Sequence, residues 1–308
     1  MNTKSLKNKL LPVILLIILL LLWEYVISND ANVTHINETI ERLTGWWPGF
    51  ESMPESMLPR PSKILRQLTK TPKNGRGGPA YFLHHTGITL AGAGWGFLIG
   101  NLAAMLLATI FLYCKPLERA MLPIALAMRS VPNVALTPLL LRIRLMVANL
   151  ESVQNSKILY ALFGSEMATK VFLVVMIVFF PTLVNVSQGL NSVSTQSLEL
   201  MKTYNASKWQ VFWKLRVPTS LPMTFAALKN AAPSAVMGIV IAEWLSSDEG
   251  LGCVIYQSYG LSQVARMMMA MFISGIISII LFLLVGKMQD WLVPWSRIST
   301  NVNEETEG

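Results

Sequence analysis

Long runs of apolar residues dominate the sequence and limit what it can fold into. An α-helix needs about 20 mainly apolar residues to cross the ~30 Å hydrocarbon core of a bilayer. Runs that reach or approach this length cover residues 10–27, 82–112, 119–141, 168–189, 223–245 and 264–286. In lipid, every backbone polar group must be hydrogen-bonded within the protein, and a helix meets this requirement by itself. We therefore predict an all-α polytopic membrane protein with six transmembrane helices.

The composition supports this class and excludes others. Only 14% of the residues are charged, whereas soluble domains have about 25%. The formal net charge of +8 fits basic cytoplasmic edges, and no nucleic-acid-binding motif accompanies it. Cys114 and Cys253 are far apart in the sequence, so they indicate neither a disulfide framework nor a metal site. The P-loop pattern G-x-x-x-x-G-K-[ST] is absent, so we do not expect this chain to bind ATP itself.

The two ends of the chain flank the apolar core. We interpret residues 1–28 as a cytoplasmic tail and an uncleaved first transmembrane helix, because lysines precede the apolar run and no small-x-small cleavage site follows it. Residues 29–81 are polar and are predicted to form an external segment. Residues 82–290 then form the transmembrane core, and residues 291–308 a second cytoplasmic tail.

Small residues recur every four positions in the 82–112 run. Gly92, Gly96 and Gly100 are followed in the same register by Ala104 and Ala108. Such a stripe lets the backbone of another helix approach closely in lipid. The alternative is that membrane helices are rich in Gly and Ala everywhere. Because the register is kept over all five positions, we expect a tight helix–helix contact along this face.

Two ionisable residues lie in or at the edge of apolar runs. Arg129 lies in the 119–141 run, which Pro132 also interrupts, and Glu243 lies near the end of the 223–245 run. Ionisable residues in membrane segments often face a polar interior and mark a transport path. For Arg129 the alternatives are an ion-pair partner or a snorkelling or helix-capping residue. For Glu243 they are a loop anchor or an interfacial carboxylate at a helix end. The sequence leaves these alternatives open.

Residues 195–222 interrupt the core with a basic, amphipathic segment. At helical spacing, Met201, Trp209 and Phe212 fall near one face, and the lysines fall on another. A connector between two membrane helices needs only a few residues. We therefore expect this segment to be bound by a partner, although a plain cytoplasmic loop remains the alternative.

Three residues predict the shape of this segment. Asn205 interrupts its middle, and Asn is the residue that best tolerates a left-handed backbone after Gly. A turn between two short helices is therefore expected there. Pro218 and Pro222 follow, and we expect them to end the second helix before the next apolar run.

The distribution of positive charge predicts the orientation of the chain in the membrane. With the N-terminus inside, six helices place both the 195–222 segment and the C-terminus in the cytoplasm. The short cytoplasmic segments then carry Lys4, Lys7, Lys9, Lys115, Arg119, Lys202, Lys208, Lys214, Arg216, Lys287 and Arg297. The external turn 246–262 carries no Lys or Arg, whereas the longer segment 142–167 contains Arg142, Arg144 and Lys157 and is an exception to the rule.

The 198–222 stretch resembles the "EAA" cytoplasmic loop of ABC-importer permeases, which has the pattern E-A-A, three residues, Gly, nine residues, I-x-L-P. The matching positions are Glu199, Leu200 and Met201, then Asn205 in place of the glycine, and Leu215 to Pro218 at the end. In that family the loop forms a coupling helix that docks into a groove on the ATP-hydrolysing subunit. The resemblance implies an ATPase-coupling role for Glu199, Met201, Tyr204, Asn205, Trp209 and Pro218.

Two further motifs resemble the nitrate/sulfonate/taurine branch of these permeases. Residues 129–139, RSVPNVALTPL, are similar to the branch pattern R-x-I-P-x-x-A-L-x-P-L, and Ala242 to Gly252 matches the pattern A-E-x-x-x-x-x-x-G-L-G. The branch places a short W-F-G-x-G loop after the first motif. This chain instead has residues 142–167, which we predict to be an external insert. We expect Arg129, Pro132 and Glu243 to belong to the translocation path.

The resemblance covers about residues 58–290 and implies a type I ABC-importer permease fold. It further implies a multi-pass protein of the cell inner membrane that works with ABC ATPase subunits and an external solute-binding protein. A second copy of the chain or a related permease would complete the membrane part. The chain would then carry no catalytic residues and no cofactor of its own, since ATP and Mg²⁺ belong to the ATPase. The expected cargo is a small solute such as nitrate, a sulfonate, taurine or a vitamin precursor.

The rival class is a secondary transporter, or a membrane scaffold protein without an ATPase. A secondary transporter is typically built from inverted repeats with charged residues near the middle of the membrane. The sequence shows no such repeat, and its charges lie mostly at the ends of the apolar runs. Co-purification with an ATPase separates the two classes.

Overall fold

The computed structural model describes residues 14–15, 17–25, 38–43, 58–69, 78–128, 130–150, 156, 165–246 and 248–295. The chain divides into two compact units. The first contains residues up to His84 together with Val254–Phe272, and the second contains His85–Cys253 together with Ile273–Gly308. All secondary structure in the described residues is helical, which agrees with the all-α prediction.

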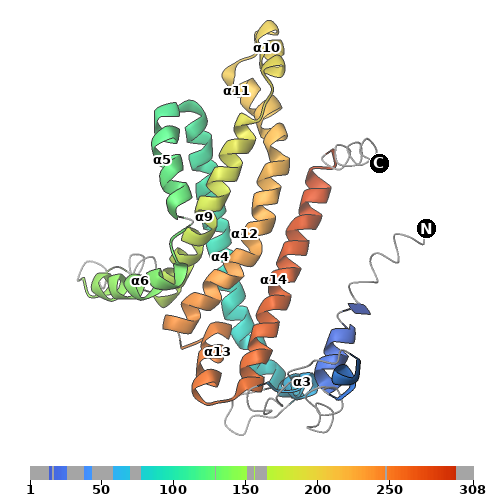
Figure 1. Cartoon of the computed structure of the whole chain (residues 1–308). Helices are drawn as coiled ribbons and strands as arrows, with labels where there is room; N and C mark the ends of the chain where they lie inside the picture. Colours follow the sequence, from blue (N-terminus) through green and yellow to red (C-terminus); the bar gives the residue numbers. More distant parts are fainter. Residues whose placement is uncertain are drawn as a thin grey trace. The chain divides into compact units, whose positions relative to one another are not determined.

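The second unit contains most of the long helices (Figure 1). These are α4 (Gly78–Tyr113, in this unit from His85), α5 (Lys115–Met128), α6 (Asn133–Ala148), α9 (Glu166–Asn191), α10 (Thr195–Thr203), α11 (Lys208–Val211), α12 (Val217–Ser246) and α14 (Val264–Leu292, in this unit from Ile273). The stretches Gly78–Tyr113, Glu166–Asn191, Lys208–Leu245 and Val264–Leu292 are long and apolar enough to cross a membrane. They confirm the predicted spans at 82–112, 168–189, 223–245 and 264–286.

The other two predicted spans have different outcomes. The run at 10–27 lies partly outside the described residues, and residues 17–25 of it are helical. The run at 119–141 is divided between α5 and α6 and forms no continuous helix, so the count of six transmembrane helices is not confirmed. Pro132 explains the break, because it has no N–H to donate and disfavours a helical conformation of the residue before it. At 1.5 Å per residue, the 14 residues of α5 extend about 21 Å, less than the bilayer core.

The core of the second unit lies where α4, α9 and α12 pack against one another. A Cβ added at Gly96 would lie 2.5 Å from the side chain of Val174 on α9, and one at Gly92 would lie 2.7 Å from Ile239 on α12. Gly100 faces Val178 at similarly close range. Ala104 and Ala108 continue the stripe and are buried in an apolar cluster with Phe111 and Leu183. Small side chains along α4 therefore allow three helices to approach closely.

The first unit contains α3 (Pro61–Thr69), the helical residues 17–25, most of α13 (Leu251–Gly260) and the start of α14. The backbone N–H and the hydroxyl of Ser62 both donate to the Glu24 carboxylate, at 3.0 and 2.7 Å. Trp23 packs against Phe272, with 6.2 Å between the ring centroids. Most of the predicted external segment 29–81 lies outside the described residues.

The predicted insert 142–167 is described only at its two ends. Its first residues continue α6 as far as Ala148, and its last residues form the start of α9, where the Ser165 hydroxyl caps the helix by accepting from Ala168 N. The residues between are described only at 149–150 and 156.

Candidate functional site

The segment between α9 and α12 forms a helical hairpin, α10 followed by α11. At the start of α10, the Ser194 side chain accepts a hydrogen bond from Ser197 N. At its end, Asn205 has φ of 50°, the left-handed backbone that the sequence predicts. Asn205 N donates to Lys202 O at 2.9 Å, and Ala206 N donates to Met201 O at 3.0 Å. This pair of bonds is the Schellman arrangement that ends a helix at a left-handed residue.

The second helix of the hairpin continues directly into the membrane helix. Ser207 and Gln210 form a capping box that starts α11, and a π-helical turn at Phe212–Arg216 then joins α11 to α12. The prediction that Pro218 and Pro222 end this helix is wrong, because both lie inside the continuous helix Lys208–Leu245.

The local geometry explains how the helix accommodates these two prolines. A proline ring presses against the carbonyl four residues earlier, and for Pro218 this carbonyl belongs to the wider π-turn. Hydroxyl groups bond carbonyls of the same region: Thr219 Oγ1 donates to Leu215 O at 2.7 Å, and Ser220 Oγ donates to Val217 O at 2.9 Å. Neither acceptor is the carbonyl four residues before a proline, which is Lys214 O for Pro218 and Pro218 O for Pro222.

The hairpin lies at one end of the α9 and α12 pair (Figure 1). It carries large exposed apolar side chains. Tyr204 is 77% exposed and Trp209 is 67% exposed, and Leu200 and Trp213 are also exposed. Glu199 is exposed, whereas Met201 and Pro218 are partly buried. Exposed lysines at positions 202, 208 and 214 surround these side chains. We refer to Leu200, Tyr204, Trp209 and Trp213 as the hairpin surface.

Below this surface, the hairpin is fixed to the helices of the second unit. Phe212 is buried in the same apolar cluster as Phe111 and Leu190. It lies between Tyr113 and Trp209, with ring centroids 6.4 and 6.1 Å away. Arg216 Nη1 donates to Leu190 O at 2.8 Å, so the start of α12 is bonded to the end of α9. The hairpin surface therefore has a buried, hydrogen-bonded base.

A polar cluster joins α5 to the C-terminal end of α9, the end that leads into the hairpin. The Glu118 carboxylate pairs with Lys115 at 2.7 Å and accepts from Ser187 Oγ at 3.0 Å and Asn191 Nδ2 at 3.1 Å. Partial burial alone would raise the pKa of Glu118, but these hydrogen bonds and the Lys115 charge hold the pKa below its ordinary value. The charged form of Glu118 is thus the one that ties α5 to α9.

At the opposite end of α12, Glu243 is fully buried and holds a loop. The Thr89 hydroxyl, from α4, donates to the carboxyl group and lies 2.9 Å from each of its oxygens. Gly252 N donates to Glu243 Oε2 at 3.0 Å, and Leu251 N donates to Thr89 Oγ1 at 2.9 Å. Gly250 N donates to His85 Nδ1 at 3.0 Å. These contacts are those of a loop anchor, one of the roles that the sequence left open for Glu243, and its full burial contradicts an interfacial carboxylate.

The two glycines of this loop have separate requirements. Gly250 has φ of 109°, a backbone that side chains other than glycine rarely adopt, and an added Cβ would overlap the Glu243 carboxyl group. Gly252 lies so close to α12 that a Cβ would be 2.7 Å from Glu243 Cβ and 2.8 Å from Trp244 N. The G-L-G sequence thus permits the backbone of the loop to reach the buried carboxyl group.

The remaining predicted path residues are not brought to this anchor. Arg129 lies outside the described residues. Pro132 is exposed and stands immediately before α6, with φ −64° and ψ 111°.

Sequence reasoning missed Thr89 and His85 as partners of the loop that Glu243 holds. The signal for them is that they are polar groups in a mostly apolar helix, four positions apart and therefore on one face.

Comparison with known proteins agrees with this arrangement. Residues 96–298 match the family of binding-protein-dependent transport system inner membrane components. The chain is 29% identical over 241 residues to the formylaminopyrimidine transport permease ThiX of Halalkalibacterium halodurans, with 78% of this chain and 86% of that protein covered. It is 24% identical to the putative aliphatic sulfonates transport permease SsuC of Bacillus subtilis, with 80% and 77% covered.

A solved structure supports the fold. A chain of the MetNI methionine ABC transporter in an inward-facing conformation superimposes with a TM-score of 0.51, over 77% of this chain and 98% of that one, at 17% sequence identity. Since the family match covers about two thirds of the sequence, the chain belongs to the binding-protein-dependent transport system inner membrane components, the permeases of ABC importers.

Proposed function

We propose that this chain is the transmembrane subunit of an ATP-driven importer and that residues 198–222 couple it to the ATPase subunits. The observation that carries the proposal is the hairpin surface, a group of exposed aromatic and apolar side chains held on a buried base. Large apolar side chains left in water are typical of a surface that a partner covers. Helices that dock into grooves are anchored by a few such residues at helical spacing.

The identity of the exposed residues fits an energetically important contact. Trp and Tyr are enriched among the residues that dominate interface affinity, and Trp209 and Tyr204 are the most exposed aromatic residues of the hairpin. Glu199 and the lysines around the surface add charged groups at its rim. Rim charges contribute mainly to the rate and specificity of association. Asn205 sets the turn that brings both helices of the hairpin to the same surface.

The contacts at the base of the hairpin would transmit its movement to the membrane helices. Phe212 and Arg216 join the hairpin to α4 and α9, and Glu118 joins α5 to α9. When ATP closes the ATPase subunits, a hairpin fixed in this way would carry the helices with it as a rigid body. Such motion alternates access to a central path, and transport requires that the solute binds the two states with different affinity.

We place both termini and the hairpin in the cytoplasm, following the positive-inside distribution. A second copy of this chain or a related permease would complete the path, with ABC ATPase subunits in the cytoplasm and a solute-binding protein outside. ATP and Mg²⁺ would be bound by the ATPase. Within the path we assign Arg129 and Pro132, and we assign Glu243 a supporting role through the loop that it anchors.

The cargo that we propose is a small solute. The relatives are named for different molecules, formylaminopyrimidine for ThiX and aliphatic sulfonates for SsuC, at 29% and 24% identity. The proposal therefore names a class, namely nitrate, a sulfonate, taurine or a vitamin precursor.

The test is pull-down of the ATPase subunit together with transport in proteoliposomes. Trp209→Ala should weaken ATPase binding by about 2 kcal/mol, the usual loss when a dominant interface residue is truncated. The matched control is Trp244→Ala, which removes an exposed tryptophan at the opposite end of α12 and should leave ATPase binding unchanged. If Trp209→Ala binds the ATPase and transports like wild type, residues 198–222 are an ordinary connector.

A further inference from the structure

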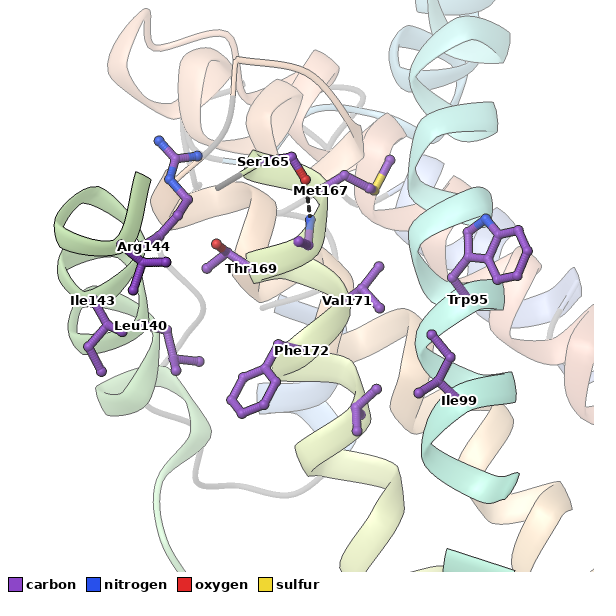
Figure 2. A pocket seen from close by; sticks show the side chains of 13 residues that line it. Trp95, Ile99, Leu140, Ile143, Arg144, Ser165, Met167, Thr169, Val171 and Phe172 are labelled. Atoms are coloured by element: carbon purple, nitrogen blue, oxygen red, sulfur yellow. Dashed lines mark hydrogen bonds between the residues drawn. The ribbon is translucent and has the colours of Figure 1, made fainter. Parts of the chain in front are cut away.

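A cavity of about 780 Å³ lies between α4, α6 and α9 (Figure 2). Its size is within the range of about 300–1,000 Å³ that is typical of ligand sites. The lining is mostly apolar and includes Trp95 and Ile99 from α4, Leu140 and Val147 from α6, and Phe172 and Val175 from α9. These side chains suit a hydrocarbon ligand and offer few polar contacts to a small, strongly hydrated solute.

One charged side chain, Arg144, lines this cavity. Its Nε atom is buried and has no hydrogen-bond partner among the residues that the structure describes. A buried nitrogen of this kind normally has a partner, so an unpaired guanidinium nitrogen indicates a missing acceptor. Figure 2 shows Arg144 and Ser165 toward one end of the cavity, with Phe172 and Ile99 farther along it. The cavity thus has a cationic end and an apolar body.

In the described part of the chain, no acidic side chain pairs with Arg144. Glu166 begins α9 close to Ser165, but it pairs with Lys170 at 2.7 Å. This pair contributes no net charge at the polar end of the cavity. Arg142, two residues before Arg144, is exposed and does not line the cavity. The charge that the described residues contribute to the lining is therefore positive and favours an anionic ligand.

We propose that this cavity binds an anionic phospholipid, with the phosphate at Arg144 and an acyl chain along the apolar lining. Arginine matches phosphate geometry with paired N–H donors, and such charge-assisted bonds are stronger than neutral ones. A hydrocarbon chain fills an apolar cavity without leaving buried polar groups unpaired. This site is separate from the hairpin surface and does not depend on the proposed coupling role.

Native mass spectrometry of the purified assembly tests the proposal by counting bound lipids. Phosphatidylglycerol should bind the wild-type protein at least tenfold more tightly than phosphatidylcholine, whose headgroup has no net charge. Arg144→Gln should weaken phosphatidylglycerol binding by about tenfold or more, the effect expected when a hydrogen bond to a charged group is lost. Arg142→Gln is the matched control, since it removes the same charge from an exposed position of the same helix, and it should keep the preference.

The location is checked with phosphatidylglycerol carrying brominated acyl chains, which quench nearby tryptophans. Trp95→Phe should remove the part of the quenching that saturates at the lowest lipid concentration, because Trp95 lines the cavity. Equal binding of both lipids by wild type overturns the proposal without requiring any variant to fold. Equal losses in Arg144→Gln and Arg142→Gln also overturn it. If neither lipid binds above background, another chain or chain segment occupies the cavity, and the proposal is wrong.

Discussion

Thr89 is the residue whose replacement tests the buried loop anchor most directly. Its hydroxyl donates to Glu243 and accepts from Leu251 N, so one side chain joins α4 to α12 and to the loop. Thr89→Val keeps the shape of the side chain and removes both bonds. It leaves Leu251 N–H buried without an acceptor, and it leaves Glu243 with only the bond from Gly252 among those described.

The expected loss follows from these contacts. Hydrogen bonds between membrane helices contribute about 0.6 kcal/mol on average and at most about 1.7 kcal/mol. A buried donor left without a partner costs about 1–3 kcal/mol. Because Thr89 and Glu243 have no exposed surface, we expect Thr89→Val to lower the free energy of unfolding by about 2 kcal/mol. Such a loss corresponds to a decrease in Tm of about 3 °C for a chain of 308 residues.

The assay measures thermal unfolding of the purified assembly in detergent. Unfolding is monitored as the loss of the monodisperse peak in size-exclusion chromatography after heating. Thr109→Val is the control, because Thr109 lies on the same helix and its hydroxyl bonds only to the carbonyl of Met105 in its own helix. Thr89→Ser should restore most of the stability, since it keeps the hydroxyl. If Thr89→Val and Thr109→Val have the same Tm, Glu243 is not held by Thr89 and the anchor described above is wrong.

Three further predictions concern the packing stripe, the hairpin turn and the α5 tether. Gly96→Ala should reduce the yield of assembled protein, whereas Gly94→Ala should not, because an added Cβ meets Val174 at Gly96 and meets nothing within 4 Å at Gly94; equal yields would place the stripe toward lipid. Asn205→Gly should retain ATPase binding and Asn205→Val should lose it, since a β-branched residue resists φ of 50°; pull-down gives the answer. The pKa of Glu118 is lower in the folded protein than its ordinary value of 4.5, so its stabilising contribution is present above that value and is lost as the pH falls through the folded pKa. The Tm difference between wild type and Glu118→Gln should therefore be largest at pH 7 and shrink in acid; a difference independent of pH would contradict it.

The sequence predicts the parts of this fold that depend on one local property. Hydropathy is sufficient to locate α4, α9, α12 and α14, because a span needs only length and apolar composition. The register of Gly92, Gly96 and Gly100 identifies a face of α4, since periodicity assigns residues to one side of a helix. Asn205 predicts its own turn because few residues tolerate that backbone.

Other features depend on three-dimensional context that a single sequence does not contain. Pro132 and Pro218 look equivalent in the sequence, yet the chain breaks at the first and continues through the second. The difference lies in the π-turn before Pro218, whose hydrogen-bond spacing is not encoded by any single residue.

The partners of Glu243 cannot be predicted from the sequence for another reason. Thr89 is 154 positions away in the sequence, and no local pattern links the two residues.

The continuous helix Lys208–Leu245 has a mechanical consequence. Its 38 residues extend about 57 Å, longer than the bilayer core is thick. Trp209 is near one tip of this rod, and Glu243, with the Gly250 to Gly252 loop, is near the other. A tilt imposed at the Trp209 tip would displace the far loop in the opposite direction about the point where α12 crosses α9. The two faces of the membrane would then be linked by one lever arm, without a relay of separate conformational changes between them.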